Sequence, residues 1–477
     1  MFKALKLHHT ALFSLLILFV LVAAKPIDDT DFWWHLKAGE LIWEQGLVPH
    51  TDPFSFSNTG QPWIAHEWLA EVIYYLAYKA GGLYGLIGVN IVILSLVFTL
   101  FYLVARLRSG RPYLSAVLTM IAALMTLFFW VYRPHLLGYA AFLAFVYLME
   151  KYKLGRTRMI WFLPAIMVFW VNVHGSYIMG LILVGLYLAA GLVRIPLGRL
   201  EDEKWSPEGV RDLTAVLGLS FLASFLNPNT YKMVFYPFFT VGNSYITDRI
   251  NEWASPDFHH PVFLVFLAAV ILVWGVAVLY DGKHRQTDLL TLALFSGMAF
   301  FAVRNIALFI FTCLPVMGHY LTGFFKARPE GRQFYALNWL AALLVAVSVA
   351  GLWPVPNDLA RHGDKTVFPA GAVNYMAQEK VLGPVFNDYN WGGYLIWHRY
   401  PENLVFIDGR TDIYAGQVFP DYLSIMKLAP QWPEILEQYE PELALIRPET
   451  PLAYALDKSP DCSLLYSDGV PVLYWAV

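Results

Sequence analysis

The sequence predicts a membrane protein of the all-α class, a bundle of about eleven transmembrane helices with a small α/β domain at its C-terminal end. The bundle is predicted because hydrophobic residues make up 58% of the 477 residues and charged residues only 14%, whereas soluble domains contain about 25% charged residues. Apolar runs also recur along the chain as far as residue 353. The separate domain is predicted because residues 354–477 are polar.

Composition also limits the partners of the protein. A net charge of −3 and an isoelectric point near 6.5 give no basic surface for nucleic acid, so no nucleic-acid partner is predicted. Two cysteines are too few for a disulfide-stabilised scaffold or a cysteine-based zinc module. The mean hydropathy of +0.50 indicates instead that the lipid bilayer is the main partner.

Eleven apolar runs approach the roughly 20 residues that a transmembrane helix needs. The first run also resembles a signal peptide, because two lysines precede it and Val22-Ala23-Ala24 would serve as a cleavage site. Cleavage would leave ten spans, but a retained span is favoured because it would anchor the polar segment that follows. The runs lie near residues 8–24, 83–105, 113–131, 136–149, 159–172, 177–193, 213–226, 261–280, 287–303, 306–322 and 335–353.

The distribution of basic residues predicts how the bundle is oriented. Loops on one side of the predicted membrane carry eighteen Lys and Arg residues, and loops on the other side carry seven. Because basic loops stay in the cytoplasm, we expect a cytoplasmic N-terminus and an extracytoplasmic C-terminal domain. The predicted location is the plasma (inner) membrane, which the chain crosses many times.

The chain is predicted to form two domains. Residues 1–353 are the transmembrane domain, in which residues 25–82 are a first external loop with two interfacial helices. Residues 354–477 are the extracytoplasmic α/β domain, joined through a linker at 351–369 that is marked by proline and glycine. Within this domain we expect strands at 385–386, 404–407 and 443–446, helices at 371–380 and 419–439, and a hairpin with an Asp-Gly turn over 464–475.

The first external loop holds the most informative run of polar residues. It begins Asp28-Asp29-Thr30-Asp31, directly after the first predicted span. Thr30 or Asp29 is the expected N-cap of a helix at the membrane interface, where tryptophan is favoured. Asp31 and His35 share one face of this helix, which makes Asp31 a candidate general base beside an imidazole. The alternative is a capped interfacial helix whose acidic residues are simply solvated.

A second interfacial helix is predicted over the run from Pro62 to Glu71, after a turn that contains Asp52. His66 and Glu67 do not form a zinc-protease motif, because position 70 is alanine where a second histidine is required. They are candidates for binding a substrate hydroxyl or for positioning the base, and Asp28, Asp29 and Asp52 are further substrate-binding candidates. A polar helix start without a functional role is the alternative.

Other polar residues interrupt the apolar runs, nearly all at the predicted outer ends of spans. Because ionisable groups at membrane depth are costly and tend to be functional, we interpret them as the lining of an external cavity. His135, His174 and Glu252 are substrate-binding candidates, and Arg133 and Arg304 are candidates for binding a lipid phosphate. Taken singly, such residues are more often structural, as when an arginine at a helix end reaches the lipid headgroups.

The chain also lacks some motifs of other enzyme classes. No Gly-rich phosphate loop occurs, which argues against a cytoplasmic nucleotide donor. The scattered histidines and aspartates show no convincing metal-ligand spacing, so we predict no obligatory cofactor or metal. A divalent metal held by some of these residues is the alternative.

The order of these elements resembles the GT-C superfamily of membrane glycosyltransferases. The segment from Asp28 to Leu69 is similar to the first loop of the protein O-mannosyltransferase and lipid A aminoarabinose transferase branch, in which an acidic residue begins the first interfacial helix. His66-Glu67-Trp68-Leu69 takes the place of the His-Pro-Pro-Leu-like turn of that branch. The run from Asn387 to Tyr394 loosely resembles the Trp-Trp-Asp-Tyr-Gly motif with which oligosaccharyltransferases recognise the acceptor, so Asp388 is a substrate-binding candidate.

One further run in the C-terminal domain, from Asp408 to Asp412, has two interpretations. The first is a strand end and a turn that an Arg–Asp pair holds in place. In the second, the run faces the cavity and contacts acceptor or sugar, which makes Asp408 a substrate-binding candidate.

The resemblance implies an inverting glycosyltransferase that takes a hexosyl or pentosyl group from a polyprenyl-phosphate carrier on the extracytoplasmic side. Asp31 would deprotonate the acceptor with His35 as its catalytic neighbour, while Arg304 and Arg133 would stabilise the departing phosphate. A flippase for a lipid-linked glycan and a non-catalytic scaffold in envelope glycan assembly stay open as alternatives. The donor sugar, the acceptor (protein, lipid or polysaccharide), the oligomeric state and which of the three leading aspartates is the base are left open.

Overall fold

The computed structural model describes residues 27, 29–155, 157–193, 198–201, 204–242, 252–324 and 368–475. The predicted spans 8–24 and 335–353, Asp28 and most of the linker 351–369 lie outside the described residues. The chain divides into two units. We call Met1–Ala23 with Ile87–Trp353 the bundle unit, and Ala24–Leu86 with Pro354–Val477 the sheet unit. The first external loop thus belongs to the same unit as the C-terminal segment.

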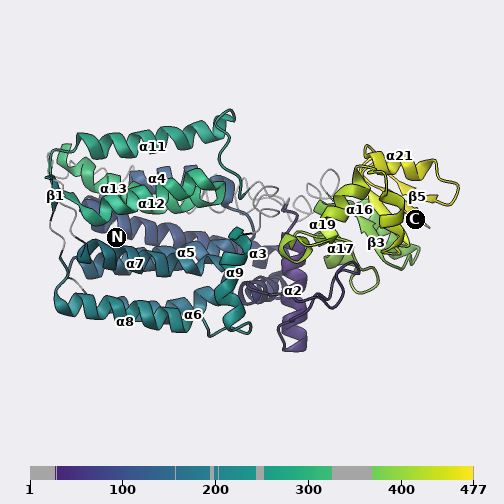
Figure 1. Cartoon of the computed structure of the whole chain (residues 1–477), viewed down its shortest axis with the longest axis horizontal. Coiled ribbons are helices and arrows are strands. Elements are labelled where there is room, and N and C mark those ends of the chain that lie inside the picture. The colour runs from purple at the N-terminus through teal and green to yellow at the C-terminus, as the bar shows by residue number, and fades with distance from the viewer. Residues whose placement is uncertain are drawn as a thin grey trace, which may run out of the picture. The chain divides into compact units, whose positions relative to one another are not determined.

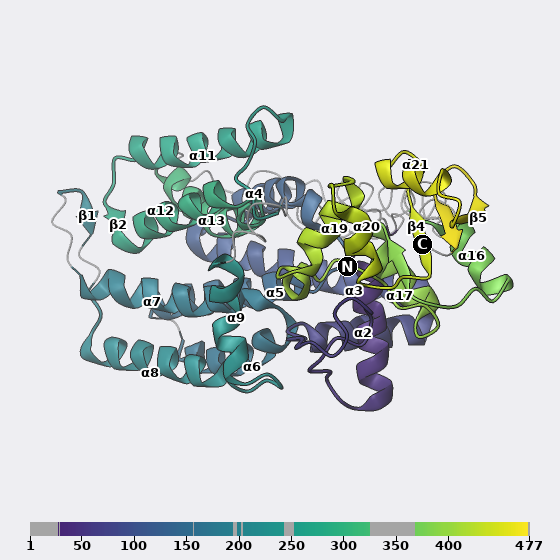
Figure 2. The same ribbon diagram turned by 45° about the vertical axis from the view of Figure 1, so that its right-hand side comes forward.

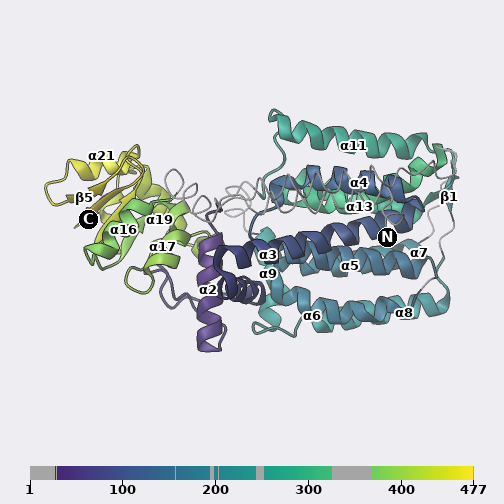
Figure 3. The same cartoon turned by 180° about the vertical axis from the view of Figure 1, so that it is seen from behind.

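Helices that lie side by side make up the bundle unit. Its described elements are α4 (Pro112–Met125), η1 (Leu127–Phe129), α5 (His135–Lys153), η2 (Met159–Phe162), α6 (Leu163–Val173), η3 (Gly175–Tyr177), α7 (Ile178–Leu192), β1 (Leu200–Glu201), α8 (Pro207–Ala223), α9 (Tyr231–Gly242), α11 (Pro261–Leu279), β2 (His284–Arg285), α12 (Gln286–Phe301), η4 (Val303–Asn305) and α13 (Ile306–Phe324). α4 packs beside α13 (Figures 1 and 3), and α7 packs beside α8 (Figures 1 and 2).

Four helical stretches are long and apolar enough to cross a membrane: Trp68–Ser109, Gly175–Leu192, Pro261–Leu279 and Val303–Phe324. Only 22% of the apolar window of α11 is buried, and Ile271 and Val278 on it are 63% and 71% exposed. Such a face suits lipid and would be costly in water, so the protein is a membrane protein. Each predicted span between residues 83 and 322 falls on a helix. The total of about eleven and the orientation stay predictions.

A kink at Gly81 and Gly82 interrupts the long helix α3 (Trp68–Ser109). Gly82 has a φ of +56° and a ψ of −138°, a conformation that residues with a side chain rarely adopt. Residues 68–80 belong to the sheet unit, and the predicted span 83–105 begins directly after the kink. A substitution of Gly82 would therefore strain the backbone at this kink, directly before the predicted span 83–105.

A four-stranded sheet is the centre of the sheet unit, with helices gathered around it (Figure 2). Its described elements are α2 (Phe32–Gln45), α16 (Ala370–Gln378), β3 (Val385–Asn387), η5 (Tyr389–Trp391), α17 (Gly392–Arg399), α18 (Thr411–Tyr414), α19 (Val418–Met426), α20 (Trp432–Glu437), β4 (Leu443–Ile446), α21 (Pro451–Asp457), β5 (Ser463–Ser467) and β6 (Val472–Trp475). The strand order is β3-β4-β6-β5, with β3 parallel to β4 and the other pairs antiparallel. The predicted strands 385–386 and 443–446, the helix 371–380 and the hairpin are confirmed.

The residues of β4 alternate between two apolar cores. Leu443 and Leu445 face a layer that contains α16, α17 and α2, together with Trp63 of the first loop. Ala444 and Ile446 face a layer that contains α19, α20 and α21. Because successive side chains of a strand point to opposite faces, both faces of the sheet are covered. The first external loop therefore supplies part of the core on one face.

Two predicted elements of the C-terminal segment are wrong. Residues 404–407 form no strand, only isolated bridges from Val405 to Ser55 and to Val385. The Phe406 N–H still donates to the Val385 carbonyl as well as to the Asn387 side chain, but the Ile407 carbonyl accepts from the Asn387 side chain instead of a backbone N–H, and the pairing ends there. The predicted helix 419–439 is divided into α19 and α20. The residues between them include Leu428, with a φ of +53°, and a proline at position 430, which lacks the N–H that a helix needs.

Candidate functional site

Asp31 stands at the start of α2, in the sheet unit. Asp31 is the N-cap residue of this helix. Among the described residues, its side chain accepts no capping hydrogen bond from the first turn of the helix. Asp29 Oδ1 accepts the Asp31 N–H at 3.0 Å, in the turn before the helix. The predicted cap at Thr30 or Asp29 is therefore wrong, because the short Asp29 side chain bonds to a backbone N–H outside the helix. The helix itself is confirmed. Because the Asp31 carboxylate does not cap the helix, it makes other contacts.

The Asp31 carboxylate lies against the backbone of Gly409. A Cβ atom built on Gly409 would be 1.7 Å from Asp31 Oδ1 and 3.2 Å from Trp34 Nε1. A Cβ atom on Gly393, in α17, would be 2.5 Å from the carbonyl oxygen of Thr30. Glycine at these two positions therefore permits the C-terminal segment to approach the start of α2 closely.

A buried ion network holds the loop that contains Gly409. Arg410 donates from Nε and Nη2 to the two carboxylate oxygens of Asp408 at 2.8 and 2.6 Å, and its Nη1 lies 2.8 Å from Asp52 Oδ1. The Tyr414 hydroxyl donates to Asp408 Oδ2 at 2.6 Å. Burial lowers the pKa of Arg410, but Asp408 and Asp52 outweigh it and raise that pKa well above the usual value. The predicted Arg–Asp pair is confirmed, and Asp52 of the first loop joins it.

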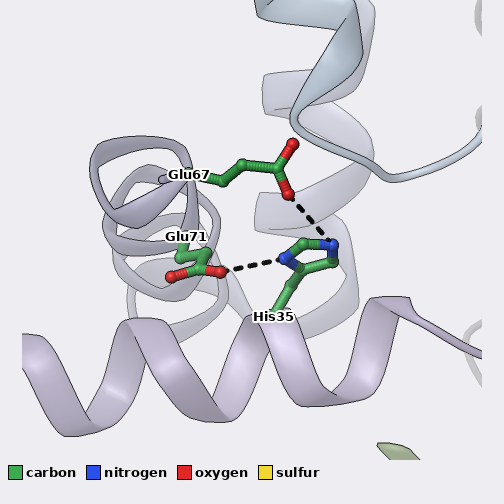
Figure 4. Close-up of side chains that lie close together, drawn as sticks. All are labelled: His35, Glu67 and Glu71. Carbon is green, nitrogen blue, oxygen red and sulfur yellow. Dashed lines mark hydrogen bonds and ion pairs between the residues drawn. The ribbon is translucent and has the colours of Figure 1, made fainter. Parts of the chain in front are cut away.

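One turn after Asp31, the ring of His35 lies between two glutamates of α3, as Figure 4 shows. His35 Nδ1 is 3.0 Å from Glu71 Oε1, and His35 Nε2 is 3.7 Å from Glu67 Oε2. The side chains of His35, Glu67 and Glu71 are 5%, 11% and 1% exposed. The backbones of α2 and α3 are also close, since a Cβ atom on Gly39 would be 2.1 Å from the Glu71 carbonyl oxygen.

Glu71 is a candidate that the sequence reasoning missed. Burial and the neighbouring Glu67 raise the pKa of Glu71 well above its usual value, while Arg410 acts in the opposite direction. The sequence did contain a signal for it, because Glu67 and Glu71 are four residues apart and so share a helix face. The sequence did not indicate that this face of the helix is directed toward His35.

In the bundle unit, the two predicted phosphate-binding arginines meet at one short segment. Arg133 Nη1 lies 3.0 Å from Glu252 Oε1, and the Arg304 N–H donates to the Glu252 carbonyl at 3.1 Å. The Arg304 guanidinium stacks 4.3 Å from the ring of Trp253. Arg133, Glu252 and Arg304 are therefore brought together. The Arg133 side chain is 24% exposed, so this group can reach a ligand.

The predicted histidines of the bundle unit are also neighbours. The rings of His135 and His174 lie 6.3 Å apart, and His135 is 5.2 Å from the ring of Tyr139. His135 Nε2 donates to the Phe129 carbonyl at 2.8 Å. His174 Nδ1 accepts the Ser176 N–H at 3.1 Å and so caps η3. Both histidines thus take part in local turns at the ends of helices.

The remaining candidates have structural contacts in the sheet unit. His66 Nδ1 donates to the Ile64 carbonyl at 3.2 Å. Asp388 caps η5 and lies 3.1 Å from Arg447 Nε. The candidates thus divide between the units. The sheet unit holds Asp29, Asp31, His35, Asp52, His66, Glu67, Asp388 and Asp408, and the bundle unit holds Arg133, His135, His174, Glu252 and Arg304.

These features define a class: a membrane protein with a helical bundle, helices at the start of its first large loop and a sheet-containing C-terminal segment. Solved structures align with this fold over nearly the whole chain. The archaeal oligosaccharyltransferase AglB from Archaeoglobus fulgidus, in complex with an inhibitory peptide and a dolichol-phosphate, aligns with a TM-score of 0.57 and 11% identity, over 98% of this chain and 74% of that one. ArnT from Cupriavidus metallidurans, bound to undecaprenyl phosphate, aligns with a TM-score of 0.52 and 13% identity, over 97% of this chain and 96% of that one.

Both of these proteins are members of the GT-C superfamily, so the chain has the GT-C fold. The predicted fold resemblance is confirmed. No protein-family model matches the sequence, and no curated protein matches it either. The branch of the superfamily that the segment from Asp28 to Leu69 resembles stays a prediction.

Proposed function

We propose that the protein is a glycosyltransferase that moves a sugar from a polyprenyl-phosphate carrier to an acceptor on the extracytoplasmic side of the plasma membrane. The observation that carries the proposal is the Asp31 carboxylate at the start of the first loop helix of a GT-C fold. Both aligned proteins were solved with a polyprenyl-type phosphate. A carrier of this kind also suits a chain whose bundle presents apolar side chains to lipid.

Asp31 is proposed as the general base. Its carboxylate takes the proton of an acceptor hydroxyl while that oxygen attacks the anomeric carbon of the sugar. The bond from this carbon to the phosphate oxygen breaks, and the electron pair leaves with the lipid phosphate. A single displacement inverts the configuration at the carbon. The N-terminal end of a helix favours a negative charge, which suits a carboxylate that must be ionised before it acts.

The bundle unit supplies the groups proposed to bind the phosphate. Negative charge develops on the leaving phosphate in the transition state, and cationic side chains stabilise it most strongly there. Arg133 and Arg304 meet at the segment that contains Glu252, and a guanidinium can bind phosphate through two parallel hydrogen bonds. Before the lipid phosphate binds, the ion pair with Glu252 fixes the position of the Arg133 side chain.

We expect Asp31→Asn to lower the rate of sugar transfer by roughly 10²- to 10⁴-fold, the usual contribution of a general base. Surface glycans and glycoproteins of a deletion strain are profiled by mass spectrometry after wild type, Asp31→Asn or Asp461→Asn is restored at equal membrane abundance. Asp461 is an exposed aspartate of the same unit and serves as the matched control. A sugar that returns with Asp461→Asn but not with Asp31→Asn supports the proposal. A sugar that returns equally with both variants removes Asp31 from the mechanism.

Gly409→Ala tests the position of the carboxylate rather than its chemistry. The new methyl group would occupy the place of Asp31 Oδ1, so the Asp31 side chain must turn away. We expect loss of transfer comparable to that of Asp31→Asn, with the thermal unfolding temperature nearly unchanged because a side chain, not the backbone, gives way. Gly416→Ala is the control, since a Cβ atom there meets nothing within 4 Å. Full activity of Gly409→Ala would show that Asp31 acts from another position or not at all.

A further inference from the structure

The helix α9 (Tyr231–Gly242) is apolar but too short to cross a membrane. Its 12 residues extend over about 18 Å, whereas the hydrocarbon core of a bilayer is about 30 Å thick. Figures 1 and 2 show that α9 runs across the direction of α7 instead of along it. The helix is nevertheless rich in aromatic residues, which are Tyr231, Phe235, Tyr236, Phe238 and Phe239.

One face of α9 packs on the bundle. Met233 and Thr240 are both buried, and they share this face because about two helical turns separate them. The Tyr177 hydroxyl of η3 donates to the Met233 carbonyl at 2.9 Å. η3 in turn lies beside the start of α5, since a Cβ atom on Gly138 would be 2.9 Å from Ser176 Oγ. These contacts fix α9 at the end of the bundle where α5 begins.

The opposite face of α9 consists of large aromatic side chains that are exposed. Tyr231, Phe235, Phe238 and Phe239 are between 58% and 65% exposed. Because an α-helix has 3.6 residues per turn, these four residues lie roughly 140–240° around the axis from Met233. The helix therefore has two apolar faces on opposite sides. One face is covered by the bundle, and the other is uncovered.

The surroundings of the exposed face favour lipid as its partner. A contiguous group of exposed aromatic side chains is costly in water and marks an interaction surface. The chain directly before α9 continues the apolar surface, because Leu222 and Leu226 are also exposed, and the same unit contains the lipid-facing helix α11. Lys232, the charged residue of α9, is exposed as well. A cationic side chain beside an aromatic face is typical of a helix that lies in the membrane interface.

We propose that α9 lies parallel to the membrane plane, with Phe235, Phe238 and Phe239 inserted between lipids at the boundary of the headgroups and the acyl chains. The bilayer itself is the partner of the exposed face. Because η3 joins α9 to the start of α5, which follows Arg133, this placement brings the start of α5 near the level of the lipid phosphates. The proposal concerns the membrane contact of the bundle unit and does not depend on the proposed transferase activity.

The test is the depth of nitroxide spin labels on the full-length chain in vesicles of phosphatidylethanolamine and phosphatidylglycerol. Cys462→Ser removes the more accessible native cysteine, and Cys313 is buried, so the label attaches at Phe235→Cys or Phe238→Cys. Collisions with oxygen, which dissolves in the bilayer, and with a water-soluble nickel chelate are compared by electron paramagnetic resonance. We expect both labels to lie roughly 5–10 Å below the headgroup surface.

Two further labels calibrate the measurement. Ile271→Cys is near the middle of α11 and marks the hydrocarbon core, and Asp461→Cys is at an exposed position of the sheet unit and marks water. A label at residue 238 that meets the nickel chelate as often as the label at residue 461 would overturn the proposal. A label as deep as that at residue 271 would also overturn it. Protection from both reagents would assign the face to a protein partner instead of lipid.

A second measurement on wild type covers the case in which the cysteine variants do not fold. Phospholipids with a photoreactive diazirine near the glycerol end of one acyl chain are added to the vesicles, and labelled peptides are identified by mass spectrometry after irradiation. We expect label on residues 235–239, and its absence there would overturn the proposal. Because neither readout uses sugar transfer, failure of this placement and failure of the proposed function are distinguishable. Lipid contact of α9 with no missing glycan in the deletion strain would leave the placement intact and remove the transferase.

Discussion

Arg410→Ala should destabilise the sheet unit by about 3–5 kcal/mol, the cost of removing one partner from a buried ion network. The side chains of Arg410, Asp52 and Asp408 are at most 1% exposed. Without the guanidinium, two carboxylates from distant parts of the chain would face each other away from water. The guanidinium also stacks 4.8 Å from the ring of Trp63, so its packing would be lost as well.

The effect is measured as the shift in thermal unfolding of the full-length chain in detergent. Arg447→Ala is the matched control in the same unit, because the Arg447 side chain is 31% exposed and its one ion pair among the described residues is with Asp388, beside a stacking contact with Trp391. We expect it to cost about 1 kcal/mol or less. Adding Asp52→Asn and Asp408→Asn to Arg410→Ala should recover part of the loss, since the uncompensated charges are then removed. Equal destabilisation by the two arginine variants would contradict the assignment.

Arg108→Ala should have a comparable effect in the bundle unit, again about 3–5 kcal/mol. Arg108 Nη1 lies 2.8 Å from Glu150 Oε1, and Nη2 lies 2.6 Å from Asp288 Oδ1. All three side chains are at most 3% exposed. The Tyr187 hydroxyl also donates to Glu150. These four residues connect α3, α5, α7 and α12, so loss of the guanidinium would weaken the contact of four helices.

The yield of folded protein and its thermal unfolding in detergent measure this second effect. Arg211→Ala is the control, because Arg211 is 73% exposed and pairs with its neighbour Asp212. We expect a change within about 0.5 kcal/mol for this control, as is usual for surface substitutions. If Arg108→Ala and Arg211→Ala unfolded at the same temperature, the network would be a consequence of helix packing rather than a cause of stability.

What the sequence predicted well depends on neighbouring residues. Apolar runs marked the helices between residues 83 and 322, and an Asp-Gly turn marked the hairpin of β5 and β6. The pair of Asp408 and Arg410 was also predicted, because the two residues are two positions apart. In each of these cases, the residues that determine the local structure are close together in the sequence.

What the sequence reasoning missed depends on partners far apart in the chain. Arg108 was not singled out, because nothing near it in the sequence indicates Glu150 and Asp288 as partners. Glu71 was not singled out, because its role depends on His35 in another helix. The predicted strand 404–407 is limited to isolated bridges, because the Asn387 side chain rather than a backbone N–H donates to the Ile407 carbonyl. Such contacts are formed by tertiary packing, and the local sequence pattern does not indicate them.

The joining of residues 24–86 with residues 354–477 in one unit has a consequence for synthesis. A ribosome that adds about 5–20 residues per second needs roughly 15–50 s to make the intervening chain. During that time Trp34, Phe54 and Trp63, which end up at most 6% exposed, have no partners from the C-terminal segment. The aromatic residues of the first loop therefore remain uncovered by the C-terminal segment until the last quarter of the protein is made. A chain that terminates early would expose the same residues permanently and give quality-control proteases a feature to recognise.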